Sequence, residues 1–437
     1  MHSSPQDTPL PPLRVGLIGL GVVGSGVHRL LSRHPAPIAR RAGRVIELHT
    51  VAVRNLARAR DLAGARPRLV DDAMAVVSEP AIDVVVEAIG GCTVARELVL
   101  AAIAHGKHVV TANKALLAQH GEQILAAAQR QGVVVAFEGA VAVSIPIVKV
   151  LREGLVANQV EWLTGIVNGT SNFVLTQMRE RGISFDDALA EAQRLGYAEA
   201  DPAFDVDGVD SAHKLALLAS LAFGTPLAFD QVTVRGIRAL QLEDLRAAER
   251  LGYRIKLLAS ARRQAGKLEQ RVEPALVPAD SLMAGVNGSM NGILVQGDAA
   301  GPTMYYGAGA GSLETASAVV ADLVEVARAA LVPARHRVPP LGLAREQAQA
   351  LPRLASQARV APHYLRVTLA PGGGLESVLR VLAESNMQVS VHVQTKGGVA
   401  LVTQAAPRSA VDEAIGLLER DAAVRSPVVG LPVEPLR

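Results

Sequence analysis

The residues best suited to chemistry lie in one stretch, residues 196–214, which reads GYAEADPAFDVDGVDSAHK. The stretch ends on Lys214, just before the apolar run LALLASLAFG, and Asp210 precedes this lysine by four residues. On a helix this spacing places the two side chains on one face. A lysine beside several acids suits a small substrate that carries an ammonium group and reacts at a hydroxyl or carbonyl. The alternative is a solvated acidic loop with a weak surface ion pair.

Most of the acids in this stretch precede the helix that the apolar run predicts. Pro202 and Gly208 interrupt the segment, so the acids before Asp210 are expected on a loop. The five carboxylates of the stretch are Glu199, Asp201, Asp205, Asp207 and Asp210.

The elements that position these residues belong to a chain of 437 residues, long enough for two or three domains. Its composition, 49% hydrophobic but only 3% aromatic, predicts a packed aliphatic core. The net charge is +3 and no basic block carries interleaved aromatics, so nucleic acid is not an expected partner. No apolar run reaches the ~18 residues that a membrane helix needs, so no membrane contact is expected.

The single cysteine, Cys92, excludes an internal disulfide framework and fits a reducing compartment. No histidine or aspartate pattern accompanies it, so it is expected in the core. Residues 1–12 are polar and proline-rich, without the apolar segment of a signal peptide, and are interpreted as a disordered tail. These features together predict a cytoplasmic protein.

A glycine-rich motif follows the first predicted strand. Residues 13–20 form a short apolar run, and an amphipathic helix follows at residues 27–31. Between them a GxGxxG motif would allow a tight turn, a close approach of a pyrophosphate to backbone N–H groups, and close helix–strand packing. A plain glycine-rich turn is the alternative. The candidate dinucleotide-binding residues of this motif are Gly19, Gly21, Val22, Val23 and Gly24.

The end of the second predicted strand, residues 47–53, bears on the choice of cofactor. An acid commonly stands there when the cofactor has a free ribose hydroxyl. This chain has Arg54 and Asn55 instead, and an arginine suits a 2′-phosphate. NADP is therefore favoured over NAD, while a solvated role for Arg54 is the alternative.

Further strands at residues 82–89 and 107–111, with a helix at 94–105 between them, predict a parallel sheet. Ligands gather at the carboxyl ends of such strands. Lys114 follows one of these ends and is expected to face the nicotinamide; the alternative is a surface lysine that opens a helix. Glu87, inside a buried strand, is either a paired structural acid or part of the cleft.

Two polar segments follow the last strand of this domain, residues 133–137. Glu138 precedes a loop of small residues, where it could bind a cation with backbone carbonyls or cap a helix. Farther on, a strand runs into Asn168, Gly169 and Thr170 before a helical run at residues 173–181. Donors at that position suit a substrate carboxylate, although a plain helix cap explains them equally well.

Taken together, five motifs resemble the homoserine dehydrogenase family. They read GLGVVG, HVVTANKAL, GIVNGTSNF, LGYAEADPAFDVDGVDSAHKLALLASLAFG and YYGAGAGSLETASAVV. They cover the chain from about Arg14 to Ala330 in the family's order, and the long acidic motif is the most specific of them.

The resemblance implies NAD(P)-dependent interconversion of L-homoserine and L-aspartate 4-semialdehyde, a step in threonine, methionine and isoleucine biosynthesis. It implies that Lys214 donates a proton to the aldehyde oxygen, that Asp210 orients Lys214 or a water, and that Lys114 lies between nicotinamide and substrate. Asp201 and Asp207 are left as structural or surface acids. Gly311 matches a cofactor-binding glycine, and the residues that match substrate positions are Glu199, Asp205, Tyr197, Thr170 and Gly196.

The resemblance also implies a sodium site at Glu138 and at the carbonyls of Val141, Val143 and Ile145. The family usually has two glycines in this loop, where this chain has Val143 and Ser144. A position that needs a positive φ would not accept valine easily. Glu314 is a second departure, because the family usually has proline there.

The C-terminal residues predict a compact βαββα module that resembles an ACT domain. The resemblance implies L-threonine as an effector and a homodimer or higher homo-oligomer. The usual Asp-Arg-Pro-Gly before the first helix is replaced by the segment from Ala370 to Gly374.

Two alternatives to the implied function are open. One is a different two-domain dehydrogenase, and the other is a catalytically silent NADP-binding sensor with an amino-acid-binding tail.

The predicted fold class is α/β, with five segments in chain order. The segments are the tail 1–12, a Rossmann NAD(P)-binding domain 13–138, an α+β catalytic and dimerisation domain 139–340, a linker 341–361, and the ACT-like domain 362–437.

Overall fold

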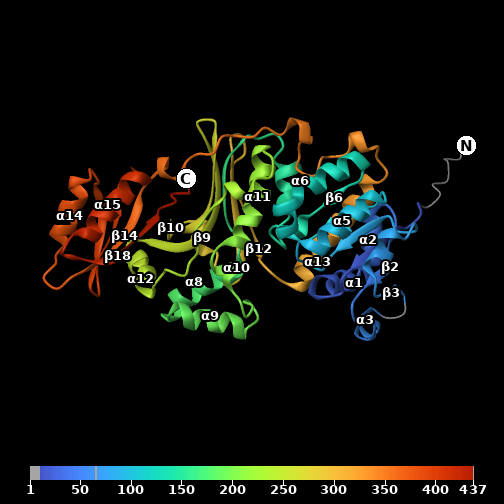
Figure 1. Cartoon of the computed structure of the whole chain (residues 1–437), viewed down its shortest axis with the longest axis horizontal. Helices are drawn as coiled ribbons and strands as arrows, with labels where there is room; N and C mark the ends of the chain where they lie inside the picture. Colours follow the sequence, from blue (N-terminus) through green and yellow to red (C-terminus); the bar gives the residue numbers. More distant parts are fainter. Residues whose placement is uncertain (1–9, 64–65, 437) are drawn as a thin grey trace, which may run out of the picture. The chain divides into compact units, whose positions relative to one another are not determined.

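The computed structural model describes residues 10–63 and 66–436 (Figure 1). Most of the predicted tail, residues 1–9, lies outside the described residues. The described chain forms two compact units, each assembled from three segments. Unit 1 comprises Met1–Asn158, Ala216–Phe229 and Ala308–Ala350, and unit 2 comprises Gln159–Leu215, Asp230–Gly307 and Leu351–Arg437. The units do not follow chain order as the predicted domain boundaries do, and those boundaries remain a proposal.

Unit 1 is built on a six-stranded sheet in the order β3-β2-β1-β4-β5-β6, and every adjacent pair is parallel. This confirms the predicted Rossmann-like sheet. The order reverses between β1 and β4, which is where such sheets open a ligand crevice. The strands are β1 Leu13–Ile18, β2 Ile46–Ala52, β3 Arg68–Val70, β4 Val84–Glu87, β5 His108–Thr111 and β6 Val135–Ala136.

Helices cover both faces of this sheet. One core joins the sheet to α1, α2 and α13, and a second core joins the opposite face to α4, α5 and α6. Helix α13 comes from far along the chain yet packs beside α1 (Figure 1). The helices are α1 Val22–Arg33, α2 Pro35–Ala42, α3 Leu56–Ala63, α4 Ala73–Ser78, α5 Thr93–Ala104, α6 Lys114–Gln131 and α13 Ser312–Ala329.

Short helical turns complete unit 1. Helix α7, Ile147–Lys149, runs directly into a π-helical turn, η2, at Val150–Gly154. The other turns are η1 Glu138–Ala140, η5 Ala334–His336 and η6 Arg345–Gln347. Cys92, predicted as a core residue, is only half-buried and stands just before α5.

Unit 2 contains a mixed sheet in the order β12-β11-β7-β9-β10-β8. Strands β11, β7, β9 and β10 pair antiparallel, and β8 pairs parallel with β10. Its elements are β7 Val160–Ile166, β8 Thr233–Val234, β9 Tyr253–Gln264, β10 Lys267–Pro278, β11 Met290–Gly297, β12 Gly301–Ala308, α8 Gly169–Arg181, α9 Phe185–Arg194, α10 Ala203–Val206, α12 Leu242–Arg250, η3 Phe229–Gln231 and η4 Leu282–Gly285. Helix α11, Val209–Phe223, begins in unit 2, and its residues from Ala216 onward belong to unit 1.

The C-terminal part of unit 2 is an antiparallel sheet in the order β15-β16-β14-β18 with two helices packed on one face. The predicted βαββα pattern is present, but it omitted the last strand, β18. That strand reads VRSPVVGLP, and its serine, proline and glycine hide the alternation of a strand. The elements are β13 Val360–Ala361, β14 His363–Leu369, α14 Leu375–Glu384, β15 Val389–Thr395, β16 Gly398–Thr403, β17 Ala406–Pro407, α15 Arg408–Arg420, β18 Val424–Pro432 and η7 Ser356–Ala358.

A buried ionic contact ties this module to the rest of unit 2. The Arg366 guanidinium on β14 donates to Asp244 of α12 at 2.5 and 3.2 Å, and the Tyr364 hydroxyl donates to the same acid at 3.2 Å. Asp244 is fully buried. Because removal of either partner would leave an uncompensated buried charge, this contact fixes where the module attaches.

Candidate active site

The glycine turn after β1 has the geometry that a dinucleotide requires. Gly19 has φ +98°, a conformation that favours glycine. A Cβ on Gly24 would lie 2.0 Å from the Gly19 carbonyl oxygen, so close helix–strand packing excludes any side chain there. Gly21, which precedes the first residue of α1, has no atom within 4 Å of its Cβ position. The space over Gly21 is therefore open to a pyrophosphate at a helix N-terminus.

This turn lies at the edge of a cavity of about 820 Å³ at the carboxyl ends of the strands. The cavity is large enough for a dinucleotide, and it extends to Arg54, Asn55 and Arg58 beyond β2. Val22 lines it, whereas Val23 packs against the core and does not. Asp71, after β3, also lines the cavity; sequence reasoning missed it because β3 is only three residues long.

Two strand ends beside this cavity are fixed by Glu87. Its carboxylate accepts hydrogen bonds from the Thr111 hydroxyl at 2.6 Å and from the backbone N–H groups of Ile89 and Gly90 at 2.9 and 3.0 Å. Glu87 is buried. Of the two roles left open by the sequence, the contacts identify a paired structural acid that shapes the edge of the cleft.

Lys114 and Gly311 also lie in unit 1. Lys114 is the first residue of α6, after β5, and Asn113 caps that helix by accepting from the Leu116 N–H at 3.1 Å. Gly311 precedes α13 with φ +142°, and the following Ser312 hydroxyl donates to the Val22 carbonyl at 2.5 Å. The glycine turn and Gly311 are thus neighbours. The Glu314 carboxylate covers Gly311, within 2.0 Å of the position that a Cβ would occupy.

In unit 2, Lys214 and Asp210 form the pair that their spacing predicts. The Lys214 ammonium donates to Asp210 Oδ2 at 2.8 Å and to the Val167 carbonyl at 2.6 Å. Their side chains are only 8% and 4% exposed, respectively. The exposed surface pair that was the alternative is therefore excluded.

Asn168 is the residue of this site that sequence reasoning did not select. Its Nδ2 donates to Asp205 Oδ1 and to Asp210 Oδ2, both at 2.8 Å, while its Oδ1 accepts from the Ser171 N–H at 2.8 Å. Asn168 therefore caps α8 and bridges two acids at once. The sequence signal at Asn168 is an asparagine before a helix, and this pattern predicts only a helix cap.

The sequence predicted Asp205 on a loop, but this residue lies on the single turn of helix α10. Pro202 precedes that turn and starts it, since proline is well tolerated at a helix start. Burial raises the pKa of Asp205, the Asn168 hydrogen bond opposes that rise, and the nearby Asp210 adds to it. Asp205 and Asp210 thus lie close together, bridged by the Asn168 amide, and Asp210 also pairs with the Lys214 ammonium.

Two other predicted substrate residues, Thr170 and Tyr197, meet at the N-terminus of α8. The Thr170 hydroxyl donates to the Tyr197 carbonyl at 2.6 Å, and the Tyr197 ring lies 4.9 Å from that of Phe173. Gly196 has φ +78° and turns the chain there. Glu199 is exposed, and its carbonyl accepts from Gln193 at 3.0 Å.

The two acids expected to be structural or superficial have surface contacts. Asp207 pairs with Arg238 at 2.5 Å, and both side chains are nearly half exposed. Asp201 accepts from the Ala203 N–H at 3.0 Å at the start of α10.

The Glu138 carboxylate caps α7, one of the two roles that the sequence left open. It accepts from the backbone N–H groups of Val148 and Lys149 at 2.8 and 3.0 Å. The Glu138 N–H donates to Asp322 at 2.9 Å, and burial raises the pKa of both acids, that of Asp322 most strongly. The described residues contain no cluster of three His, Cys, Asp or Glu side chains able to hold a metal ion.

Val143 in this loop has φ +56°, so the strained position anticipated from the sequence is present. A β-branched residue is rarely found there. The carbonyl of Ile145 already accepts from the Ile147 N–H at 2.8 Å.

A parallel sheet with a glycine turn over an open cavity, together with a buried lysine–aspartate pair elsewhere in the chain, defines a nicotinamide-dependent dehydrogenase. Residues 19–138 match the family model described as "Homoserine dehydrogenase, NAD binding domain", and residues 146–324 match "Homoserine dehydrogenase". The chain belongs to the homoserine dehydrogenase family, NAD(P)-dependent oxidoreductases that act on a CH–OH group.

Relatives match along nearly the whole chain. A homoserine dehydrogenase from Pseudomonas aeruginosa is 49% identical over 435 residues, covering 98% of this chain and 100% of the relative. One from Neisseria gonorrhoeae is 42% identical over 434 residues, with the same coverage. The crystal structure of a homoserine dehydrogenase from Thiobacillus denitrificans has a TM-score of 0.93 and 51% identity, covering 98% of this chain and 100% of that one.

No helix within residues 10–63 and 66–436 has the length and apolar character needed to cross a membrane.

Proposed function

We propose that the chain reduces L-aspartate 4-semialdehyde to L-homoserine, and reverses that reaction, with Lys214 as the proton donor. The observation that carries this proposal is the hydrogen-bonded arrangement of the buried Lys214, Asp210 and Asn168 with the partly buried Asp205. An ammonium held by a buried acid has a fixed position, and a positive charge there stabilises the oxygen anion that forms during reduction.

The bound nicotinamide supplies the hydride that reaches the aldehyde carbon, and the chain supplies the proton. The Lys214 ammonium gives one proton to the aldehyde oxygen as the C–H bond forms. Asp210 holds the lysine in position through the 2.8 Å contact. In the oxidative direction the neutral amine accepts the hydroxyl proton, so one residue serves both directions.

The neighbouring groups are proposed to hold the amino-acid end of the substrate. Asp205 and Glu199 bind the ammonium, and Thr170, Tyr197 and Gly196 shape the surroundings. The carboxyl of Asp205 is only 2.8 Å from Asn168 Nδ2, which keeps it in place for that role. Lys114 is proposed to lie between nicotinamide and substrate in the ternary complex.

We propose NADP as the preferred nicotinamide cofactor, with NAD as the alternative. The residues fit: Gly21 leaves the helix start open, and Arg54 and Arg58 line the far part of the cavity. Two guanidinium groups there suit a 2′-phosphate. Asp71 is the one acid among the described residues that line this cavity. Its carboxylate suits the free ribose hydroxyl of NAD instead.

Four further properties of the chain are proposals. A sodium ion binds at the Glu138 loop through backbone carbonyls. The C-terminal module is an ACT-like domain that binds L-threonine. The enzyme is a homodimer or higher homo-oligomer, and it acts in the cytoplasm.

A spectrophotometric assay of L-homoserine oxidation, with NADP and NAD in parallel and in sodium and potassium buffers, tests the reaction and its cofactors. Lys214→Ala should lower kcat by roughly 10²–10⁴, the usual contribution of a general acid, with cofactor affinity unchanged. Asp207→Ala, at the surface pair, is the matched control and should retain activity. Unchanged turnover in Lys214→Ala would exclude the proton-donor role.

A further inference from the structure

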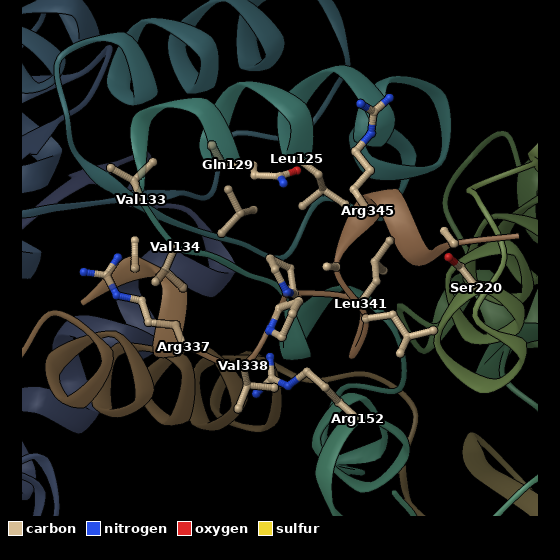
Figure 2. A pocket seen from close by; sticks show the side chains of 18 of the residues that line it. Leu125, Gln129, Val133, Val134, Arg152, Ser220, Arg337, Val338, Leu341 and Arg345 are labelled. Carbon is tan, nitrogen blue, oxygen red and sulfur yellow. The ribbon is translucent and has the colours of Figure 1, made fainter. Parts of the chain in front are cut away.

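A second cavity lies within unit 1, at the opposite edge of the parallel sheet from the glycine turn. It is about 340 Å³ in volume, and it is lined by residues that precede and open β6, by α6 and by the segment after α13 (Figure 2). Val133 and Val134 stand at the amino end of β6, whereas the dinucleotide cavity lies at the carboxyl ends. The two cavities are therefore separate sites.

The walls of this cavity are mostly apolar. Leu125, Val134, Val338, Pro340 and Leu341 contribute aliphatic surface from three different segments. A cavity of this size accommodates a small organic molecule, and burial of its aliphatic part would be favourable.

The Arg152 guanidinium brings a charge to this apolar space. Arg152 extends from η2 toward the cavity (Figure 2), and its side chain is only 3% exposed. Its Nη2 donates to Glu153 at 2.6 Å and forms an ion pair with Glu325 at 2.8 Å, and its Nε donates to Glu153 at 3.1 Å. Among the described residues, none accepts a hydrogen bond from Nη1. That nitrogen remains as a donor for a ligand.

The backbone that carries Arg152 is also unusual. Residues Val150–Gly154 form a π-helical turn that follows α7 directly. Single π-turns are rare and frequently occur at functional sites. This observation is independent of the cavity itself.

The charges of the lining favour an anion. Four arginines and two glutamates line the cavity, and both glutamates are engaged. Glu325 pairs with Arg152 at 2.8 Å and with Lys149 at 3.0 Å. Glu122 accepts from the Leu227 N–H at 2.9 Å and pairs with Arg345 at 3.2 Å. No lining carboxylate among the described residues is left for an ammonium, so a zwitterion fits less well than a simple anion.

We propose that this cavity binds a small aliphatic monocarboxylate, with its carboxylate on Arg152 Nη1 and its alkyl group among the apolar walls. The site is independent of the proposed reaction and of the cofactor. It is connected to the Glu138 loop, because Lys149 pairs with Glu325 through its side chain and donates its backbone N–H to Glu138 at 3.0 Å. Lys149 thus contacts both the lining of the cavity and the Glu138 loop.

Calorimetric titration of the full chain with three probes of similar shape tests the proposal. The probes are 4-methylpentanoate, 4-methylpentanamide and L-leucine. The carboxylate should bind once per chain with a Kd on the order of 1 mM or tighter. The amide and the zwitterion should bind at least about tenfold more weakly, because one lacks the charge and the other brings an unpaired ammonium. Equal binding of acid and amide, or no binding of the acid at ~20 mM, would overturn the proposal.

Two variants locate the site. Val134→Phe fills the cavity without changing a charge and should abolish binding of 4-methylpentanoate. Arg68→Ala is the matched control, since Arg68 does not line the cavity and its side chain is 63% exposed; binding should persist. Saturating NADP should leave the Kd unchanged. Unaltered binding in Val134→Phe, or competition by NADP, would place the carboxylate elsewhere and refute the assignment. The comparison of acid with amide on the unmodified chain decides the question even if a variant fails to fold.

Discussion

Asn168 offers the sharpest test of the site, because one amide caps a helix and separates two acids. Two substitutions divide these roles. Asn168→Ser keeps a side-chain oxygen to accept from the Ser171 N–H but loses both donors to Asp205 and Asp210. Asn168→Asp keeps the acceptor as well and places a third carboxylate where the amide nitrogen stood, 2.8 Å from each acid.

The expected magnitudes follow from these contacts. Hydrogen bonds to charged groups contribute roughly 1.5–3 kcal/mol each, so Asn168→Ser should lower the free energy of unfolding by about 3–6 kcal/mol. Asn168→Asp should cost more at neutral pH, since repulsion is added to the lost bonds. The pKa of Asp205 is already raised, and a third acid would raise it further. The folded state then binds more protons than the unfolded chain, so stability falls as pH rises above the ordinary carboxyl pKa.

Urea unfolding of both variants between about pH 5 and pH 8 measures this difference, and kcat for L-homoserine follows the site itself. The deficit of Asn168→Asp relative to Asn168→Ser should grow as the pH rises, and kcat should fall in both. If the two variants unfold at the same urea concentration at every pH, the amide does not separate two charged acids, and the assigned geometry is wrong.

Other residues give contrasting outcomes. Gly24→Ala should destabilise the fold, because its Cβ would lie 2.0 Å from the Gly19 oxygen. Gly21→Ala should fold normally but lose cofactor affinity. Thermal melts measure the first effect, and a fluorescence titration of NADPH measures the second. Asp322→Asn should flatten the dependence of unfolding free energy on pH: the raised pKa of Asp322 means that the native protein loses stability as pH rises through that pKa, and an equal slope in the variant would contradict this. Val143→Gly should raise stability by about 1 kcal/mol through relief of a left-handed valine, measured by urea unfolding, and lower stability would show that the lost side-chain packing dominates.

The sequence predicted those features whose cause is local. The glycine turn, the parallel strands around it and the Asp210–Lys214 pair all follow from spacing over a few residues. Val143 could also be anticipated, because a left-handed position is a property of the backbone at one residue.

What the sequence could not supply depends on contacts between distant segments. Asn168 meets Asp205 across 37 residues, so its bridging role is invisible in its own motif. β18 was missed because its pairing with β14 overrides a serine, a proline and a glycine. The second cavity requires α6, η2 and the segment after α13 to assemble, and no short pattern announces it.

Helix α13 carries a consequence for how the protein is made. Together with α1 and α2 it covers one face of the nucleotide-binding sheet, although 175 residues of the chain separate β6 from its first turn. During translation, the part of that face which α13 covers stays exposed until the ribosome has released the helix. A truncated product ending near Asn158 would lack α13, and the aliphatic side chains of the sheet that contact Val319 would be exposed to solvent. Exposed apolar surface of this kind makes nascent fragments prone to aggregate and dependent on chaperones.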